Sequence, residues 1–266
     1  MWPTLIRIGS FEITTFGLMM FAAFVVGGWV LTRQFRRYDL PEDEATNVLL
    51  AAALGGILGA KIYYAILFGD VSLLFTRAGL VWYGGLIGGA IACLVLIRWR
   101  KLPLFRVADS VAPGLAIGYS LGRIGCFLVG DDYGRPTESF VGIAFPRGAP
   151  PTTAGSLRRH FGVDIDSLVP DSALLRVHPT QLYEAGAAFL MFLILLSASK
   201  RPHVAGRVFG LFLVLLGIER FLVELVRVKD DRFLGPFTVA QLISVIAIGI
   251  GIWLASRRRG GKVEAA

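Results

Sequence analysis

Two arginines stand inside long apolar segments of the sequence, where a charged side chain is costly unless it is paired or faces a polar cavity. Arg123 follows Gly122, and Arg220 lies about two helical turns inside a segment that ends near Arg227. A guanidinium group binds phosphate oxygens through paired hydrogen bonds. Arg123 and Arg220 together therefore predict a clamp for a phosphate group in a partly dry site. The alternative for Arg123 is a side chain that extends to the membrane surface.

Arg220, Glu224 and Arg227 are spaced four and three residues apart, so a helix places them on one face. The carboxylate can then orient a guanidinium group on either side of it. Glu219 lies beside this stripe, and we assign it to pairing between helices. Glu184 lies near a predicted helix start, where we expect its carboxylate only to interact favourably with the helix dipole.

Polar residues also gather where apolar segments meet a long polar region. Asp131 and Asp132 follow Cys126 on one side, and His178 precedes Pro179 at an expected helix start on the other. His178 is either a general base near neutral pH or a hydrogen-bonding group that holds the polar region to the helix. The two aspartates either orient an arginine or cap a turn.

The sequence carries no pattern that predicts a metal or cofactor site. Its two cysteines, Cys93 and Cys126, have neither the spacing of metal ligands nor the number needed for a disulfide framework. Phosphate-binding loops, zinc-protease motifs and ferredoxin cysteine runs are absent from it. We expect Cys126, which follows two nearby glycines, to be a small packing residue, and those glycines can loosen the helix and expose backbone N–H groups.

Composition shows which elements must position these residues. Apolar side chains make up 55% of the 266 residues, charged ones 17%, and the mean hydropathy is +0.66, which excludes a soluble domain. The apolar residues form seven segments of about 20 residues, the length that spans a bilayer. The sequence thus predicts an all-α integral membrane protein with about seven transmembrane helices: residues 16–31, 48–68, 81–97, 107–129, 181–198, 208–226 and 237–255.

Pairs of glycines four residues apart recur within these segments, and such pairs let helices approach closely. Close packing is the main interpretation, and a lipid head group that approaches the bare backbone at Tyr83-Gly84-Gly85 is the alternative. The pairs are Gly55 and Gly59, Gly84 and Gly88, Gly85 and Gly89, and Gly118 and Gly122.

Residues 130–179 interrupt the apolar segments and hold six of the twelve prolines. We expect a small extracytoplasmic head domain built from turns and short strands, with a disordered loop as the alternative. It would separate transmembrane helices 1–4, in residues 1–129, from helices 5–7 and a basic cytoplasmic tail, in residues 180–266.

Basic residues predict the orientation of the chain in the membrane. Fourteen Lys and Arg residues lie in the loops after residues 31, 97, 198 and 255, and ten lie in the longer stretches on the opposite side. Because short basic loops are retained in the cytoplasm, the N-terminus is expected in the periplasm and the C-terminus in the cytoplasm. The net charge of +8 is thus a topology signal, and no nucleic-acid partner is expected.

Four motifs in this order resemble the prolipoprotein diacylglyceryl transferase family, over most of the chain. They are Tyr83-Gly84-Gly85-Leu86-Ile87-Gly88-Gly89; Gly122-Arg123-Ile124-Gly125-Cys126-Phe127 through Gly134-Arg135-Pro136-Thr137; His178-Pro179-Thr180-Gln181-Leu182-Tyr183-Glu184; and Glu219-Arg220-Phe221 through Glu224 and Arg227.

The resemblance implies an enzyme of the bacterial inner membrane. The family moves a diacylglyceryl group from phosphatidylglycerol to the lipobox cysteine thiol of a prolipoprotein, which forms a thioether and releases glycerol phosphate. Arg123 and Arg220 match its essential arginines and would stabilise the leaving phosphate. The positions expected to contact phosphatidylglycerol are Arg123, Arg220, Gly84, Gly85, Cys126, Asp131, Gly134, Glu224 and Arg227.

Some positions depart from the family pattern. Tyr83 stands where the family has histidine, Cys126 where it has asparagine, and Phe16 where it has tyrosine. Either Tyr83 or His178 then handles the thiol proton, or no dedicated base is needed. The alternative function is a non-catalytic phospholipid-binding or lipid-moving membrane protein derived from this family. A solute transporter would show two matching halves, which the sequence lacks.

Overall fold

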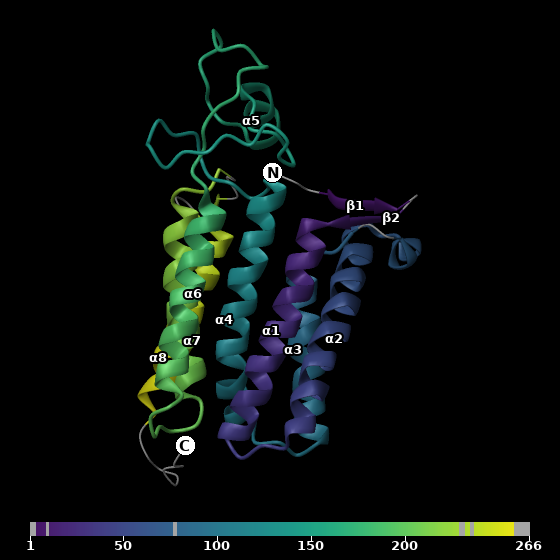
Figure 1. Ribbon diagram of the computed structural model, residues 1–266, viewed down its shortest axis with the longest axis vertical. Helices are drawn as coiled ribbons and strands as arrows, with labels where there is room; N and C mark the ends of the chain where they lie inside the picture. Colours follow the sequence, from purple (N-terminus) through teal and green to yellow (C-terminus); the bar gives the residue numbers. More distant parts are fainter. Residues whose placement is uncertain (1–3, 9–10, 77–78, 229–231, 235–236, 258–266) are drawn as a thin grey trace. The chain divides into compact units, whose positions relative to one another are not determined.

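The computed structural model describes residues 4–8, 11–76, 79–228, 232–234 and 237–257, and these form a mostly helical structure (Figure 1). Arg258, Arg259 and Lys262 of the predicted basic tail lie outside the described residues. The elements are β1 (Thr4–Ile8), β2 (Phe11–Thr14), α1 (Thr15–Arg37), α2 (Glu42–Phe68), the 3-10 helix η1 (Val71–Phe75), α3 (Trp82–Trp99), α4 (Leu104–Val129), α5 (Ala154–Phe161), α6 (Thr180–Ala198), α7 (Arg207–Glu224), β3 (Arg232–Leu234), β4 (Phe237–Thr238) and α8 (Val239–Ser256).

Six of these helices, namely α1, α2, α3, α4, α6 and α8, are long and apolar enough to cross a membrane. The chain is therefore an all-α integral membrane protein with several spans. Helix α7 covers the seventh predicted segment and has 18 residues, but four of them are charged: Arg207, Glu219, Arg220 and Glu224. Because of these charges, α7 is not among the helices that could cross a membrane by length and composition. The predicted count of seven spans therefore stays a prediction.

The helix ends fall close to the predicted segment ends, with two exceptions of six residues each. Helix α1 continues to Arg37, past the predicted end at Leu31, because its last turns carry the basic residues Arg33, Arg36 and Arg37. Helix α2 begins at Glu42, six residues before the predicted Val48, because Glu42, Asp43 and Glu44 occupy its first turn. Acidic side chains at a helix N-terminus interact favourably with the free backbone N–H groups there. This first turn is charged, so the apolar pattern of the sequence does not predict it as part of the span.

The described chain forms two compact units, and one of them is Gly28–Val111. Within it α2 packs against α3 along the paired glycines (Figure 1). A Cβ atom built on Gly59 would lie 2.3 Å from the carbonyl oxygen of Gly84, and one on Gly88 would lie 2.4 Å from that of Gly55. Any side chain at these positions would push the helices apart, so the predicted close packing is confirmed for these pairs.

The other unit contains the remaining described residues, in which α6, α7 and α8 lie side by side (Figure 1). Helix α7 packs closely on α8 because Gly210 and Gly251 face each other's backbone. Helix α4 is continuous through Gly122 and Gly125, so the predicted loosening of the helix there is wrong. Gly125 instead contacts α1, where its Cβ atom would lie 3.0 Å from that of Met19.

The pair Gly118 and Gly122 does not show the predicted close packing. A Cβ atom on Gly118 would lie 3.9 Å from the nearest atom outside its own helix, and one on Gly122 would meet nothing within 4 Å. The spacing of small residues alone therefore does not identify a helix contact.

Residues 130–179 fold around a small apolar core. Tyr133, Phe145, Leu157 and Val177 are buried there, and the rings of Tyr133 and Phe145 stack with centroids 5.6 Å apart. The helix α5, which the apolar pattern does not predict, begins at an N-cap, Thr153, whose side chain accepts a hydrogen bond from the Ser156 backbone. The predicted short strands are absent from this described segment, where strand pairing is limited to isolated bridges.

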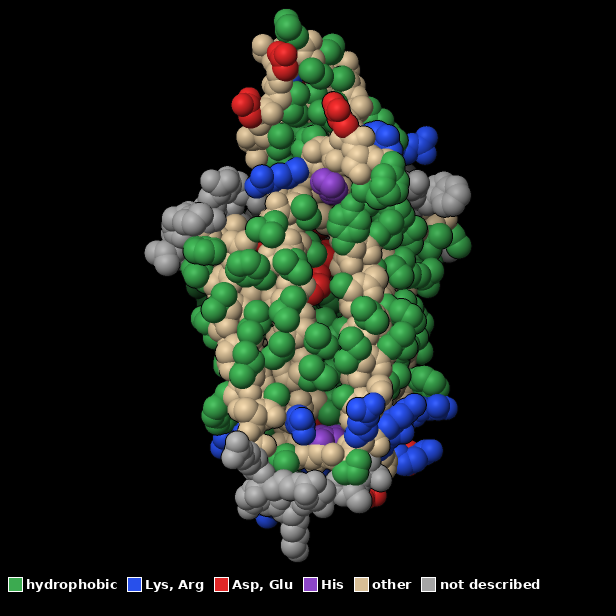
Figure 2. Space-filling view, turned by 90° about the vertical axis from the view of Figure 1, so that its left-hand side faces the viewer, with side chains coloured by type: hydrophobic (Ala, Val, Ile, Leu, Met, Phe, Trp, Pro, Cys, Tyr) green, Lys and Arg blue, Asp and Glu red, His purple; other side chains and the backbone are tan. Residues whose placement is uncertain are grey.

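Large apolar side chains cover the outer faces of the helices (Figure 2). Ile66 and Trp253 are each more than half exposed. A water-exposed surface of this kind would aggregate, whereas lipid tails solvate it. Figure 2 also shows a few acidic side chains visible among the apolar ones.

Candidate active site

Glu184 is the centre of a cluster of arginines from α4, α7 and the segment after α7, all in the unit that contains α6, α7 and α8. Its side chain, near the start of α6, is fully buried. Arg123 of α4 places its Nε atom 3.0 Å from Oε2, and Arg220 of α7 places an Nη atom 3.4 Å from Oε1. Arg227 lies 3.7 Å from the same Oε1. The expectation that Glu184 interacts only with the helix dipole is therefore wrong.

The two arginines of the predicted phosphate clamp point toward the same carboxylate from two helices. Arg123 is 15% exposed, and its guanidinium group also lies over the ring of Tyr119, at 5.4 Å from the centroid. Arg220 is 28% exposed and is held by Glu224 one turn later, at 2.7 Å. The predicted stripe on α7 is thus confirmed for Arg220 and Glu224, with Glu224 orienting Arg220, whereas Arg227 lies past the end of α7 at Glu224 and reaches the cluster from the following segment.

Asp132 closes the cluster from the loop that follows α4. One of its oxygens lies 3.0 Å from Arg123 and the other lies 2.9 Å from Arg227. Its backbone has a φ of 56°, in the left-handed region that aspartate tolerates better than most residues. The sequence is compatible with either an orienting or a capping role for Asp132, and this geometry supports the orienting one.

Gly134 fixes this loop against the ends of α6 and α7. Its backbone N–H donates to the carbonyl oxygen of His178 at 2.8 Å, and it forms an isolated bridge with Arg227. A Cβ atom here would lie 2.6 Å from the carbonyl oxygen of Val226 and 2.8 Å from the Cβ atom of His178. Only glycine permits this approach, so Gly134 positions Asp132 and Arg227 through the backbone.

His178 takes part in this junction mainly through its backbone. Its N–H donates to the carbonyl oxygen of Arg135, and its ring nitrogen Nδ1 lies 3.2 Å from the hydroxyl oxygen of Tyr183. These contacts support the hydrogen-bonding interpretation. The role of His178 as a general base stays a prediction.

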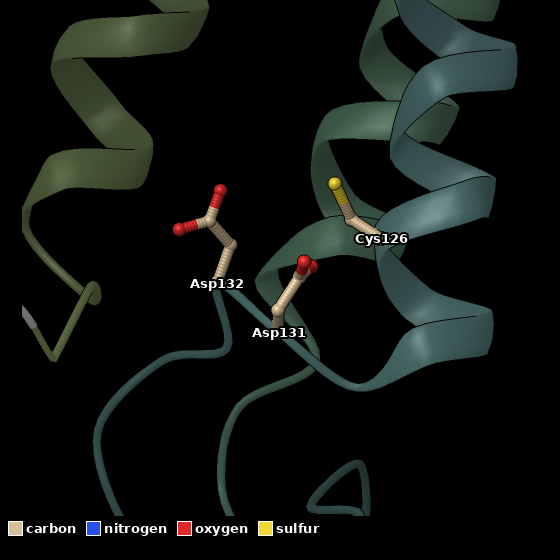
Figure 3. Close-up of side chains that lie close together, drawn as sticks. All are labelled: Cys126, Asp131 and Asp132. Atoms are coloured by element: carbon tan, nitrogen blue, oxygen red, sulfur yellow. The ribbon is translucent and has the colours of Figure 1, made fainter. Parts of the chain in front are cut away.

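Cys126 and Asp131 lie next to each other at the end of α4, and the carboxylate of Asp132 points away from both (Figure 3). One ligand atom from each of the three lies within 4.8 Å of the others. Asp132 is already held by two arginines, so this group offers a metal ion little uncompensated negative charge. The Cys126 sulfur lies 3.9 Å from Arg123.

The two aspartates have opposite electrostatic environments. Burial raises the pKa of the Asp131 carboxyl group, and the charge of Asp132 raises it further. Burial acts on Asp132 in the same direction, but the charges of Arg227 and then Arg123 outweigh it and lower the pKa of Asp132. Asp132 is therefore the firmly ionised member of the pair.

Tyr83, Gly84 and Gly85 lie at the start of α3, in the compact unit Gly28–Val111. Gly84 is buried against α2, where a Cβ atom would lie 2.4 Å from the carbonyl oxygen of Gly59. This contact supports the packing interpretation of the motif. Tyr83 is 39% exposed, its ring meets that of Trp82 edge to face, and its hydroxyl has no hydrogen bond within the described chain.

The arrangement is suited to binding a phosphate group. Three guanidinium groups converge from α4, α7 and the segment after α7, and each is held by a carboxylate: Glu184 and Glu224 are buried, and Asp132 is nearly half exposed. Arginines fixed in advance bind oxyanions without reorganisation. Arg220 is the most exposed of the three, and its contact with Glu184 is long, so an incoming phosphate can replace that contact.

Comparison with known proteins gives one consistent result. Residues 3–257 match the family model described as prolipoprotein diacylglyceryl transferase. A protein of Geobacter sulfurreducens named phosphatidylglycerol-prolipoprotein diacylglyceryl transferase is 32% identical, and the match covers 97% of both chains. Proteins of the same name from Clostridium tetani and Xanthomonas euvesicatoria are 28% and 32% identical, over 96% and 98% of this chain and 96% and 92% of their own. The chain belongs to the prolipoprotein diacylglyceryl transferase family.

Proposed function

We propose that this protein transfers the diacylglyceryl group of phosphatidylglycerol to the lipobox cysteine of prolipoproteins. The relatives carry this activity and both substrates in their names, and they match the chain over nearly its full length. The single observation that supports it most is the pair Arg123 and Arg220, which meet opposite oxygens of the buried Glu184.

The chemistry follows from what the two arginines can stabilise. The cysteine sulfur attacks the carbon of the diacylglyceryl group that is bonded to the phosphate oxygen. The new C–S bond forms as that C–O bond breaks, and glycerol phosphate leaves with an additional negative charge. Arg123 and Arg220 bind the phosphate, and the charge that develops on it strengthens their hydrogen bonds.

Neighbouring residues hold this site in place. Glu224 orients Arg220, and Asp132, the most exposed carboxylate of the cluster, holds Arg123 and Arg227. Gly134 and the backbone of His178 fix the loop that carries Asp132. We include Tyr83, Gly84, Gly85, Cys126 and Asp131 among the positions near the lipid, as the family pattern implies.

The topology follows the basic loops. We place the chain in the bacterial inner membrane with seven spans, α7 being the charged one that lines the site. Residues 130–179 then form an extracytoplasmic head between spans 1–4, in residues 1–129, and spans 5–7, in residues 180–266. The N-terminus faces the periplasm and the C-terminus the cytoplasm.

The test uses purified protein in vesicles that contain phosphatidylglycerol, together with a lipobox peptide. Release of glycerol phosphate in proportion to thioether-linked peptide is expected, with no release when the peptide cysteine is replaced by serine. A protein that binds or moves the lipid without either product would contradict the transferase and support the lipid-moving alternative.

A further inference from the structure

Glu219 is a buried carboxylate beside the site that no arginine holds. It lies on α7 directly before Arg220 and is 7% exposed. Within the described chain no ion pair holds its oxygens and neither meets the geometric criteria of a hydrogen bond, which contradicts the expected pairing between helices. Tyr119 is the side chain near enough to interact with it as a hydrogen-bond partner. Burying a charge without a partner costs free energy, so an unpaired carboxylate inside a membrane span indicates a functional role.

The groups that face Glu219 come from three helices. Tyr119 and Arg123 of α4, Glu184 of α6 and Arg220 of α7 all act on it electrostatically. Helix α8 packs against the same part of α7 but carries no titratable side chain. The Tyr119 hydroxyl donates a hydrogen bond to Glu184 at 3.2 Å and is also close enough to interact with Glu219. The hydroxyl donates to Glu184 in this structure, and rotation about its C–O bond would direct the same proton toward Glu219.

Charge balance distinguishes Glu219 from the other carboxylates. The three arginines are matched by Asp132, Glu184 and Glu224, each of which would lose an ion pair if it took up a proton. Glu219 would lose none. During transfer the thiol gives up a proton while the phosphate gains negative charge, so a proton taken up by Glu219 keeps the total charge of the site constant.

We propose that Glu219 is the terminal acceptor of the thiol proton and that Tyr119 passes the proton to it. The S–H proton moves to the Tyr119 oxygen as the Tyr119 hydroxyl proton moves to a Glu219 oxygen. Tyr119 ends neutral, Glu219 ends neutral, and the thiolate displaces glycerol phosphate. The proton then leaves with the phosphate product or to water. Tyr119 is partly exposed whereas Glu219 is closed off, which is why the path includes the tyrosine. This inference rests on the proposed function.

The experiment compares Glu219→Gln and Tyr119→Phe with the wild type in the glycerol phosphate assay across pH. At neutral pH we expect each variant to lose about 100-fold or more in kcat, with KM for phosphatidylglycerol changed less than about threefold. The acid limb of the wild-type profile should vanish in Glu219→Gln, whose rate should instead rise with ionisation of the free thiol near about pH 8.5. The double variant should be no slower than either single one.

Glu138→Gln, which changes an exposed carboxylate in residues 130–179, is the control and should match the wild type. If Glu219→Gln does not fold, Tyr119→Phe carries the test, because it keeps the ring under Arg123. A Glu219→Gln protein with wild-type kcat and pH profile, or with a change confined to the alkaline limb, would overturn the proton path alone. A wild-type protein that releases no glycerol phosphate would overturn the proposed function.

Discussion

Glu184 determines how the three arginines are arranged, because it is the one carboxylate in the described chain that all of them approach. Breaking a buried ion pair by removing one partner leaves the other charge buried and uncompensated. Each arginine keeps a second carboxylate partner, Asp132 or Glu224, so Glu184→Gln is expected to destabilise the protein by less than the ~3–5 kcal/mol of an isolated buried pair. Thermal unfolding in detergent measures this, with Glu138→Gln as a control that should leave the unfolding temperature unchanged. An unchanged unfolding temperature for Glu184→Gln would show that the arginines do not depend on it.

Asp132 should make the stability of the cluster depend on pH in a defined direction. Arg227 and Arg123 lower its pKa in the folded protein below the ordinary value of 3.8. Its contribution is therefore fully present above pH 3.8 and is lost as the pH falls through the lowered folded value. Because the side chain is nearly half exposed, solvent screens part of this contribution.

Asp132→Asn should accordingly be less stable than the wild type at about pH 5–7, with the difference narrowing only below pH 3.8. Unfolding measured at several pH values tests this prediction. A difference that already disappears between about pH 5 and 7 would mean that Asp132 is not held by the arginines.

At the scale of elements, the junction between the loop after α4 and the ends of α6 and α7 positions the charged residues. Gly134→Ala places a methyl group where the carbonyl oxygen of Val226 lies 2.6 Å away. We expect a loss of about 1–3 kcal/mol in stability and a lower transfer rate, since Asp132 and Arg227 move with the strained backbone. Gly186→Ala is the matched control, because a Cβ atom there meets nothing within 4 Å. Equal behaviour of the two variants would contradict this role of Gly134.

The sequence predicted the long helices well because an apolar run of membrane-spanning length rarely forms anything but a transmembrane helix. It also predicted that Arg123, Arg220, Glu224 and Arg227 share a site. It did not predict Glu184 as the centre, because a glutamate at a helix start commonly interacts with the helix dipole alone. The central position of Glu184 becomes visible only when α4, α6 and α7 are placed together.

The smaller elements were missed for related reasons. Helix α5 has eight residues and no apolar run, and the hairpin of β1 and β2 precedes the first span and carries none of the recognisable motifs. The glycine pairs illustrate the same limit, since the spacing is identical for Gly55 and Gly59, which pack closely, and for Gly118 and Gly122, which do not. Which helix faces a glycine is a property of tertiary packing.

At the scale of the whole molecule, the basic loops predict which side of the membrane each segment faces. Single cysteines introduced at Ser139, in the proposed head, and at Lys200, after α6, test this in a background without Cys93 and Cys126. A membrane-impermeant maleimide added to intact cells should label the cysteine at position 139 but label the one at position 200 only after lysis. The reverse pattern would invert the proposed topology.

The central claim is that Arg123 and Arg220, which share Glu184, hold the phosphate of phosphatidylglycerol while sulfur displaces it. Lysine keeps the charge but cannot form the paired hydrogen bonds of a guanidinium group. The most direct measurement is the rate of glycerol phosphate release by folded Arg123→Lys and Arg220→Lys proteins, with phosphatidylglycerol and lipobox peptide both at saturating concentration. Each variant should lose on the order of 100- to 1000-fold in kcat. Rates within about threefold of the wild type for both variants would contradict the claim.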